Sequence, residues 1–332
     1  MRKTGLFLAS IVLSATLWAE LPEKKGLDVI NRANAEAYIG FLASDALEGR
    51  EAGFRGGRIA GEYIVSNLKT MGIEPLFESY YQPFEAYNKE RQKKGRFQVH
   101  PDSIAKLKQG VHQKLSMNNI LGKIEGKNPN EYVIIGAHYD HLGFDPMLDG
   151  DRVYNGADDN ASGVSAVLQV AKAFLATGVQ PERTVIFAFW DGEEKGLLGS
   201  KYFVQTFSEM DKVKGYLNYD MIGRNKDESK PMHVVYFYTE AHPVFGDWLK
   251  NDIKKYGLNL TPDYRPWDKP VGGSDNASFA LLDIPVIWYH TDGHPDYHMP
   301  SDHVEKINWN KIVDITKASF LNMWNLASEK DY

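Results

Sequence analysis

From residue 119 to the end of the chain, short apolar runs alternate with amphipathic segments. The run RTVIFAFW at 183–190 has the length and the β-branched and aromatic residues of a buried strand. The segment 162–178 repeats apolar residues at helical spacing and ends at a glycine. Strands that alternate with helices form a mainly parallel sheet with helices on both faces. The alternation therefore predicts an α/β fold, a three-layer α/β/α sandwich around a mainly parallel mixed central sheet.

Further elements follow from the same periodicities. Residues 28–75 are expected to be helical, with Gly72 and Pro75 ending the last helix of this stretch. The polar residues 80–118 are expected to form strands and a hairpin. Beyond them we expect strands at 119–126, 131–140, 214–223, 232–238 and 284–290, and helices at 197–207, 243–257 and 308–328.

The first residues have the pattern of a secretory signal peptide. Arg2 and Lys3 precede an apolar stretch at 5–17, which is too short for a comfortable transmembrane span. We therefore expect a signal peptide at 1–19 and a single domain at 20–332. The mature protein would then be exported, periplasmic or secreted, with no stable membrane anchor.

The composition narrows the chemistry that the chain can perform. With 38 basic and 44 acidic residues, its formal net charge is −6, which argues against a nucleic-acid-binding protein. The chain has no cysteine, which excludes cysteine nucleophiles, disulfides and cysteine-ligated zinc. A bound metal would have to be held by histidine, aspartate and glutamate.

Metal-binding residue types follow four successive predicted strands, at the point where each strand ends. In an α/β sheet these ends meet at one edge, where ligands bind. Carboxylates at a buried strand end are costly unless they are paired or bind a metal. Nitrogen and oxygen donors from several strand ends suit zinc, or two zincs that share a carboxylate. The donors are His138, Asp140, Asp158, Asp159, Glu193, Glu194, Asp220, His290, His294, His298 and His303.

The motifs in this rim resemble those of the M28 family of zinc aminopeptidases. They are AHYDHLG, NGADDNASG, DGEEKGLLGS, NYDMIG, GGSDNASFALLDIPVI and YHMPSD, and the resemblance covers residues 119–325. The upstream segment LASDALEGREAG at 42–53 is similar to the N-terminal part of bacterial members. The resemblance implies a zinc-exopeptidase fold at 20–332 and two Zn²⁺ ions per chain. It also implies an aminopeptidase that acts on peptides with a free N-terminus.

The resemblance implies a ligand role for five residues. His138 would bind the first zinc, and Glu194 would complete that site. Asp220 and His298 would complete the second site. Asp159 would bridge the two ions.

Three further residues would act beside the ions in the same resemblance. Glu193 would be the general base, and Asp140 would orient the imidazole of His138, as a metal-bound histidine usually requires. Tyr297 would help to stabilise the oxyanion. The resemblance also implies a cis peptide bond after Asp159.

Other polar residues of the rim receive no ligand role. Asp158 is expected to support its neighbours or a turn. Asn276 stands where the family commonly has a histidine near the substrate, so it bears on specificity. A pocket rim or a solvated loop is expected for His141, His290, His294 and His303.

Three alternative functions remain at this point. The first is a glutaminyl cyclase-like transferase with one zinc, and the second is a non-catalytic binding relative that has lost the metals. The third is a carboxypeptidase, because the same dinuclear site serves both kinds of exopeptidase. The paired glutamates argue against the cyclase, and the complete set of five ligand positions argues against the binding relative. Neither feature separates an aminopeptidase from a carboxypeptidase. Cobalt or manganese could occupy a site of this type in place of zinc.

Overall fold

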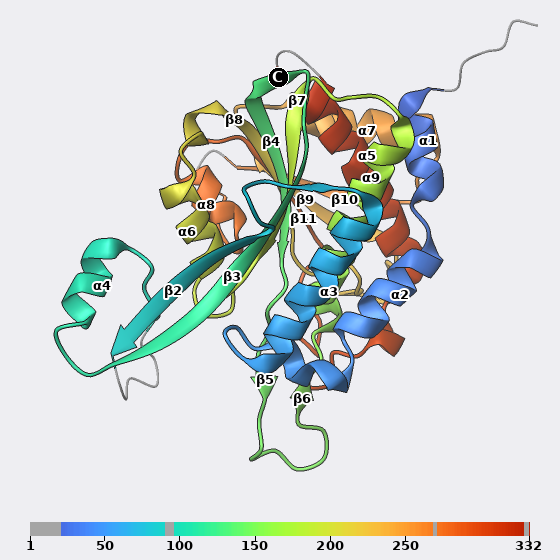
Figure 1. Ribbon diagram of the computed structural model, residues 1–332. Coiled ribbons are helices and arrows are strands. Elements are labelled where there is room, and N and C mark those ends of the chain that lie inside the picture. The colour runs from blue at the N-terminus through green and yellow to red at the C-terminus, as the bar shows by residue number, and fades with distance from the viewer. Residues whose placement is uncertain (1–20, 90–95, 268–270, 329–331) are drawn as a thin grey trace, which may run out of the picture.

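The computed structural model describes residues 21–89, 96–267, 271–328 and 332 (Figure 1). The signal peptide expected at 1–19 lies outside the described residues. Within the described part, none of the helices combines the length and the apolar character that a membrane span requires.

One mixed sheet of nine strands runs through the described part of the molecule. Its strands are β1 (Glu74–Pro75), β2 (Tyr81–Lys89), β3 (His112–Ile124), β4 (Asn128–His138), β7 (Arg183–Trp190), β8 (Val213–Tyr219), β9 (His233–Thr239), β10 (Thr261–Trp267) and β11 (Val286–His290). The order across the sheet is β1–β3–β7–β4–β8–β11–β9–β10, with β2 paired to β3. The four neighbours β7, β4, β8 and β11 are mutually parallel, so their carboxyl ends lie at one edge. A separate pair, β5 (Gly143–Phe144) and β6 (Val153–Tyr154), projects beyond this edge (Figure 1).

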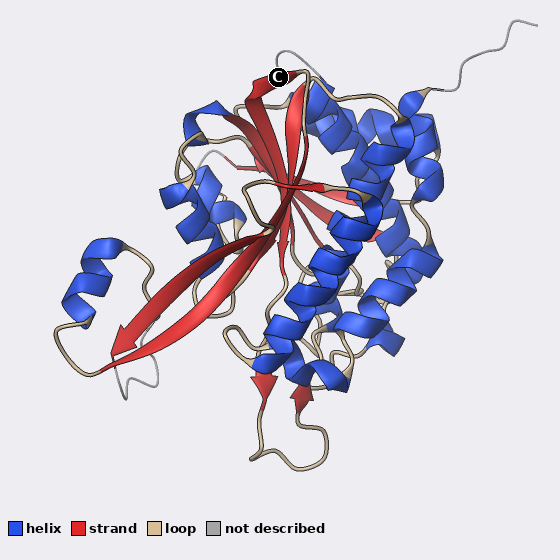
Figure 2. Ribbon diagram, viewed as in Figure 1, coloured by secondary structure: helices blue, strands red, loops and turns tan. Residues whose placement is uncertain are grey.

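Helices cover both faces of the sheet (Figure 2). One face carries α1 (Pro22–Val29), α2 (Arg32–Leu42), α3 (Arg55–Met71), α5 (Gly163–Thr177), α7 (Val244–Tyr256) and α9 (Trp309–Ser328). The other face carries α6 (Leu198–Thr206) and α8 (Asn276–Ala280). The structure therefore confirms the expected α/β/α sandwich around a mixed central sheet, in which the four central strands β7, β4, β8 and β11 are parallel.

The central strands are apolar because they are buried on both faces. In β4, Val133 and Ile135 belong to the core under the larger helical layer, whereas Ile134 belongs to the core under α6 and α8. All eight residues of β7 are buried. A strand with two buried faces has a continuous apolar run instead of an alternating pattern, and this is the signal that the sequence carries at 183–190.

A long hairpin leaves the main body of the sheet at the positions expected for the polar excursion. β2 and β3 pair in antiparallel fashion from Tyr81 opposite Ile120 to Lys89 opposite His112. A helix that the sequence does not predict, α4 (Pro101–Leu107), lies at the end of this hairpin (Figure 1). A small apolar core that includes Phe84, Met117 and Leu198 joins the hairpin to the start of α6.

Other differences from the expected elements have local causes. The helical stretch expected at 28–75 contains the end of α1, all of α2 and α3, and a short helical turn, η1 (Asp45–Arg50), between α2 and α3; its last two residues form β1. β10 is not expected because it contains Pro262 and Pro266, but it is an edge strand paired only with β9, where proline is tolerated. The five residues of α8 are too few to show a helical period.

Candidate metal centre

The structure brings the five expected ligands together at the carboxyl edge of the central strands. His138 is the last residue of β4, Asp220 directly follows β8, and Glu194 lies shortly after β7. Asp159 precedes α5, and His298 lies in the loop after β11. Four of the side chains are at most 12% exposed, and that of His298 is 37% exposed.

Asp159 lies between two groups of possible ligands. Its Oδ1 is 3.3 Å from His138 Nε2, which in turn is 3.7 Å from Oδ2 of Asp220. Its Oδ2 is 3.2 Å from His298 Nε2, which is also 3.2 Å from Oε2 of Glu194. Each oxygen of Asp159 therefore faces a different group, as a bridging carboxylate would.

The donor set fits zinc. Donor atoms at zinc bond lengths of about 2.0–2.1 Å lie roughly 3.3 Å apart when their arrangement is tetrahedral. The separations around Asp159 fall between 3.2 and 3.7 Å. The donors are imidazole nitrogens and carboxylate oxygens, which are ligands that zinc accepts. The cluster is therefore compatible with a two-metal site that shares one carboxylate.

The grouping of the ligands differs from the one expected from the sequence. His138 was expected to share an ion with Glu194, but it lies beside Asp220, and Glu194 lies beside His298. The strand register explains the difference. Tyr219 pairs with Ala137, so the residue after β8 arrives next to His138, whereas the turn after β7 carries Glu194 away from it.

His141 is part of the cluster, although the sequence predicts it at a rim or in a solvated loop. It is buried, its Nδ1 lies 2.7 Å from Oε1 of Glu194, and it lies 3.9 Å from Oδ2 of Asp159. One donor atom from each of His141, Asp159 and Glu194 lies within 4.8 Å of the others. Its Nε2 has no partner among the described residues. The sequence feature that could have indicated a place for His141 in the cluster is its position three residues after His138 in AHYDHLG.

Asp140 holds the turn that carries the paired glutamates. Its Oδ1 accepts the backbone N–H of Glu193 at 3.0 Å, and its Oδ2 accepts that of Glu194 at 3.4 Å. The ring of His138 donates from Nδ1 to the main-chain oxygen of Asp140 at 3.2 Å, while the nearer carboxylate oxygen is 3.7 Å away. Asp140 thus contacts the imidazole, as the resemblance implies, but through its main-chain oxygen and not through its carboxylate.

The buried charges of the cluster shift one another's pKa values in opposite directions. Burial alone would raise the pKa of Asp159, but the rings of His141, His138 and His298 hold it well below its usual range. Burial raises the pKa of Glu193 well above its usual range, and the Asp220 carboxylate adds to this effect. Asp159 therefore stays ionised, whereas the neighbouring Glu193 takes up a proton more readily than an ordinary glutamate.

A second buried network supports the backbone around Asp159. Oδ2 of Asp302 accepts the backbone N–H groups of Asp158 and Asp159 at 3.0 and 3.1 Å. Oδ1 of Asp158 accepts the N–H of Gly223 at 2.6 Å, and its Oδ2 lies 3.2 Å from Nε2 of His294. Asp158 therefore has the supporting position that the sequence suggests. The expectation of a rim or solvated loop for His294 was wrong, because its side chain is fully buried.

The two remaining histidines of the rim lie in different environments. His290 is partly buried, and its Nδ1 donates to the main-chain oxygen of Asp220 at 2.6 Å, so it contacts the backbone of an expected ligand. His303 is 37% exposed and lies 2.9 Å from a carboxylate oxygen of Asp151, as a residue of a solvated loop would.

Arg50 connects the N-terminal helices to the backbone of the cluster. Its guanidinium is buried and donates to the main-chain oxygens of Leu42, Tyr139 and Asn155 at 2.6, 2.9 and 2.5 Å. It also donates to the main-chain oxygens of Gly156 and Asp159 at 3.0 and 3.4 Å. Burial lowers its pKa to about 10, so it is charged at neutral pH. Among the described residues it forms no ion pair. Its acceptors include the segments that carry His138 and Asp159.

A cleft of about 670 Å³ leads to the cluster. Tyr297 lines it with Glu193 and Glu194, and the Tyr297 ring stacks on His298 with centroids 3.9 Å apart. Burial and the nearby carboxylates raise the pKa of Tyr297, so its hydroxyl keeps its proton. Gly273 also lines this cleft, whereas Asn276 is buried and donates to the main-chain oxygen of Val271.

The peptide bond between Asp159 and Asn160 is cis, as the family resemblance implies. Asn160 is buried, and its Nδ2 donates to the main-chain oxygen of Tyr219 at 2.9 Å. Its Oδ1 accepts the N–H of Gly163 at 3.0 Å. This asparagine therefore links Asp159 to the end of β8 and to the start of α5.

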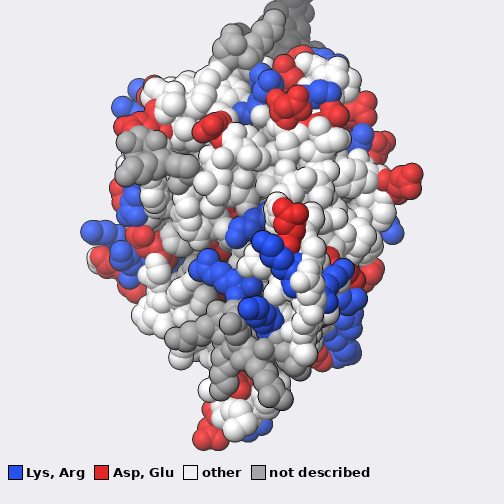
Figure 3. Space-filling model, turned by 90° about the vertical axis from the view of Figure 1, so that its left-hand side faces the viewer, with Lys and Arg blue, Asp and Glu red and all other residues white. Residues whose placement is uncertain are grey.

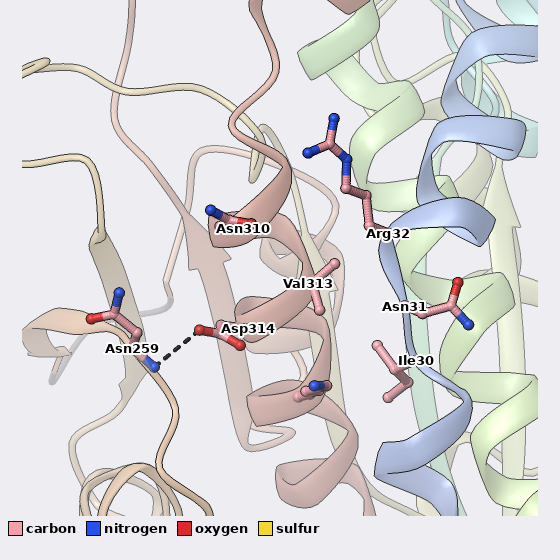
Figure 4. A pocket seen from close by; sticks show the side chains of 8 residues that line it. Ile30, Asn31, Arg32, Asn259, Asn310, Val313 and Asp314 are labelled. Carbon is pink, nitrogen blue, oxygen red and sulfur yellow. Dashed lines mark hydrogen bonds between the residues drawn. The ribbon is translucent and has the colours of Figure 1, made fainter.

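A second hollow, of about 390 Å³, lies against α9 (Figure 4). Its polar lining includes Asn31 and Arg32 at the start of α2 and Asn259 and Asn310. The carboxylate of Asp314 accepts the N–H of Asn259 at 3.0 Å. The described lining of this hollow contains no histidine and only one carboxylate, so it lacks the donors that a metal site needs.

Comparison with known proteins places the chain in a family. The family model of peptidase family M28 matches residues 119–322. The leupeptin-inactivating enzyme 1 of Streptomyces exfoliatus is 34% identical over 170 residues, which are 51% of this chain and 34% of the relative. The chain thus spans about a third of the length of this curated relative.

Solved structures share the fold. The zinc aminopeptidase BSAP of Bacillus subtilis has a TM-score of 0.70 at 17% identity, covering 94% of this chain and 98% of that chain. The glutaminyl cyclase of Porphyromonas gingivalis has a TM-score of 0.60 at 16% identity, covering 89% and 99%. At these identities the likeness concerns the fold alone. The family match, by contrast, covers more than half of the chain and includes all five expected ligands, and this chain belongs to peptidase family M28.

Proposed function

We propose that this chain is a zinc-dependent aminopeptidase that releases N-terminal residues from peptides. The observation that carries the proposal is the position of Asp159, whose two oxygens face separate groups of metal-binding side chains. Two-metal sites occur in aminopeptidases and other hydrolases. Membership of peptidase family M28 supports the same activity.

Two zinc ions would be held by the groups that share Asp159. His138 and Asp220 would hold one ion with it, and Glu194 and His298 the other. When bound, zinc supplies Lewis acidity, which polarises a carbonyl and lowers the pKa of water. The ring of His141 would position Glu194 by their 2.7 Å contact.

Glu193 is the proposed general base. Its raised pKa lets its carboxylate accept a proton from the attacking water and later return it to the leaving amine. The carboxylate of Asp140 keeps the backbone of this residue in place. The hydroxyl of Tyr297, which keeps its proton, would donate to the developing oxyanion.

The proposed substrates are peptides with a free N-terminus. The carboxylates of the cluster supply negative charge, which attracts an ammonium group. We further propose that the enzyme acts outside the cytoplasm. The basic residues and the apolar stretch at the start of the sequence support this location.

The test combines metal analysis with a comparison of free and blocked substrates. The purified protein should contain two zinc ions per chain and should hydrolyse leucine p-nitroanilide but not its N-acetylated form. Removal of zinc with a chelator should abolish hydrolysis, and added zinc should restore it. Activity on N-acetylated peptides that releases their C-terminal residues would contradict the proposal and indicate a carboxypeptidase.

The glutaminyl cyclase alternative gives a different result in the same test. A cyclase would contain one zinc ion and would convert peptides with N-terminal glutamine into pyroglutamyl peptides without releasing an amino acid. A chain without bound zinc and without either activity would support a non-catalytic binding protein.

A further inference from the structure

The cleft that leads to the proposed metal centre carries three cationic side chains. Arg96, Lys195 and Lys201 line it together with Glu193 and Glu194. Figure 3 shows lysine and arginine side chains gathered on the face from which the β2–β3 hairpin projects. These cations stand out because the whole chain has a net charge of −6, and none of them has a part in the proposed reaction.

The three cations differ in how their charge is compensated. Nζ of Lys195 lies 2.8 Å from a carboxylate oxygen of Glu51, which forms an ion pair with it. Nζ of Lys201 donates to the main-chain oxygen of Gly196 at 2.9 Å. Neither Lys201 nor Arg96 forms an ion pair with a carboxylate of the described residues. Two of the three charges therefore form no ion pair in the described part of the protein, although the nearby carboxylates of Asp275 and Glu193 act to raise the pKa of Lys201.

Arg96 and Lys201 converge on the same backbone position. A Cβ atom added to Gly196 would lie 4.0 Å from Cδ of Arg96, and the carbonyl of Gly196 accepts from Lys201. Burial and the nearby charge of Arg96 lower the pKa of Lys201, as expected for two cations that are close together. An anion between them would relieve this repulsion and complete their hydrogen bonds.

We propose that Arg96 and Lys201 bind a carboxylate of the substrate, so that this enzyme prefers peptides with a negative charge near the scissile bond. The inference rests on the proposed aminopeptidase function. Lys201 lies in α6, within the same cleft as the proposed base Glu193. A substrate bound at Glu193 would extend along the wall that carries both cations. Arginine matches a carboxylate with paired N–H donors, and lysine adds a point charge.

Two carboxylates of a peptide could fill this position. One is the side chain of an acidic N-terminal residue, and the other is the C-terminal carboxylate of a dipeptide. Each source has a neutral isostere, which lets an experiment separate them. Glutamyl p-nitroanilide has its match in glutaminyl p-nitroanilide, and the dipeptide Leu-Gly has its match in Leu-Gly amide.

The test measures binding separately from hydrolysis. The zinc-loaded Glu193→Gln variant should bind all four compounds without hydrolysing them at a useful rate, and calorimetry then gives their dissociation constants. At least one acid should bind about tenfold more tightly than its amide, since one charge-assisted hydrogen bond is worth that much. Hydrolysis of Leu-Gly amide by the unmodified enzyme reports the aminopeptidase activity, so a failure of that function is seen separately.

Matched substitutions assign the preference to particular cations. Arg96→Met or Lys201→Met in the Glu193→Gln background should reduce the ratio of acid to amide affinity about tenfold. Lys195→Met removes a cation from the same cleft, but one that Glu51 already neutralises, and it should change this ratio less than twofold. Equal binding of acid and amide in both pairs would overturn the inference. The inference would also be overturned if Lys195→Met reduced the ratio of acid to amide affinity as much as Lys201→Met does.

Discussion

The carboxylate of Asp140 accepts the backbone N–H of Glu193 at 3.0 Å, so the second residue after β4 fixes the turn that follows β7. This contact links the proposed base to the strand that ends in His138. It also predicts how the site responds to a small change. In Asp140→Asn, an amide group replaces one acceptor oxygen, so one of the two backbone N–H groups in the turn loses its partner.

We expect Asp140→Asn to reduce kcat by about 10- to 100-fold, the usual cost of losing a group that supports a metal site. Zinc content, measured by mass spectrometry, should stay at the level of the unmodified protein, because His138 still donates to the main-chain oxygen of residue 140. An unchanged kcat would show that the turn does not depend on this carboxylate.

Substitutions of the paired glutamates Glu193 and Glu194 should affect turnover and zinc content separately. Glu193→Gln keeps the shape of the side chain and removes the base, so turnover should fall by about 10²–10⁴-fold while zinc content persists. Glu194→Gln should lower zinc content, because this residue lies 3.2 Å from His298 in the second group. The opposite pair of outcomes would mean that the two glutamates exchange roles.

Substitutions of the two histidines beside Glu194, His298 and His141, should differ in how many zinc ions the protein binds. His298→Ala should reduce zinc from two ions to one per chain, because it removes a proposed ligand. His141→Asn keeps a hydrogen-bond donor near Glu194 and should leave two ions bound with lower affinity. Zinc release to a chromogenic chelator measures both effects. Loss of an ion in His141→Asn and not in His298→Ala would make His141 the ligand.

Replacement of Arg50 should strongly destabilise the protein. Arg50→Met leaves buried main-chain oxygens without their donor, including those of Leu42 and Tyr139. An unsatisfied buried acceptor costs about 1–3 kcal/mol, so the free energy of unfolding should fall by at least about 3 kcal/mol. The control is Arg32→Met, which breaks an exposed ion pair with Glu36 and should cost less than about 1 kcal/mol. Urea denaturation measures both, and similar losses would contradict the prediction.

Asp252 in α7 predicts a pH-dependent stability. It is buried, its Oδ2 has no partner among the described residues, and burial raises its pKa to about 7. Its contribution to stability is therefore fully present below the unfolded pKa of about 4 and is lost as the pH rises through about 7. Asp252→Asn removes this ionisation. The variant should melt at a higher temperature than the parent at pH 8.5, and the difference should shrink at pH 4.5. A difference that is the same at both pH values would exclude this cause.

The sequence predicts the edge of the sheet that carries the cluster because that prediction depends only on strand order and direction. Parallel strands ending in His138 and Tyr219 necessarily place the residues that follow at one edge. The grouping of the ligands that the family resemblance implies differs from the one in the structure. The grouping depends on strand register and on the path of a turn, and a run of apolar residues specifies neither. The positions of His141 and His294 depend on loop packing, which has no periodic signal in the sequence.

Arg50 lies outside the stretch 119–322 that matches the family model, yet it donates to the main-chain oxygens of Tyr139 and Asn155 inside that stretch. A transplant of this stretch onto another N-terminal region would carry all five proposed ligands and would still leave these buried oxygens without a donor. The smallest portable form of the site must therefore include η1 with its arginine. Substitutions near residue 50 and in the ligand loops are then expected to be inherited together rather than independently.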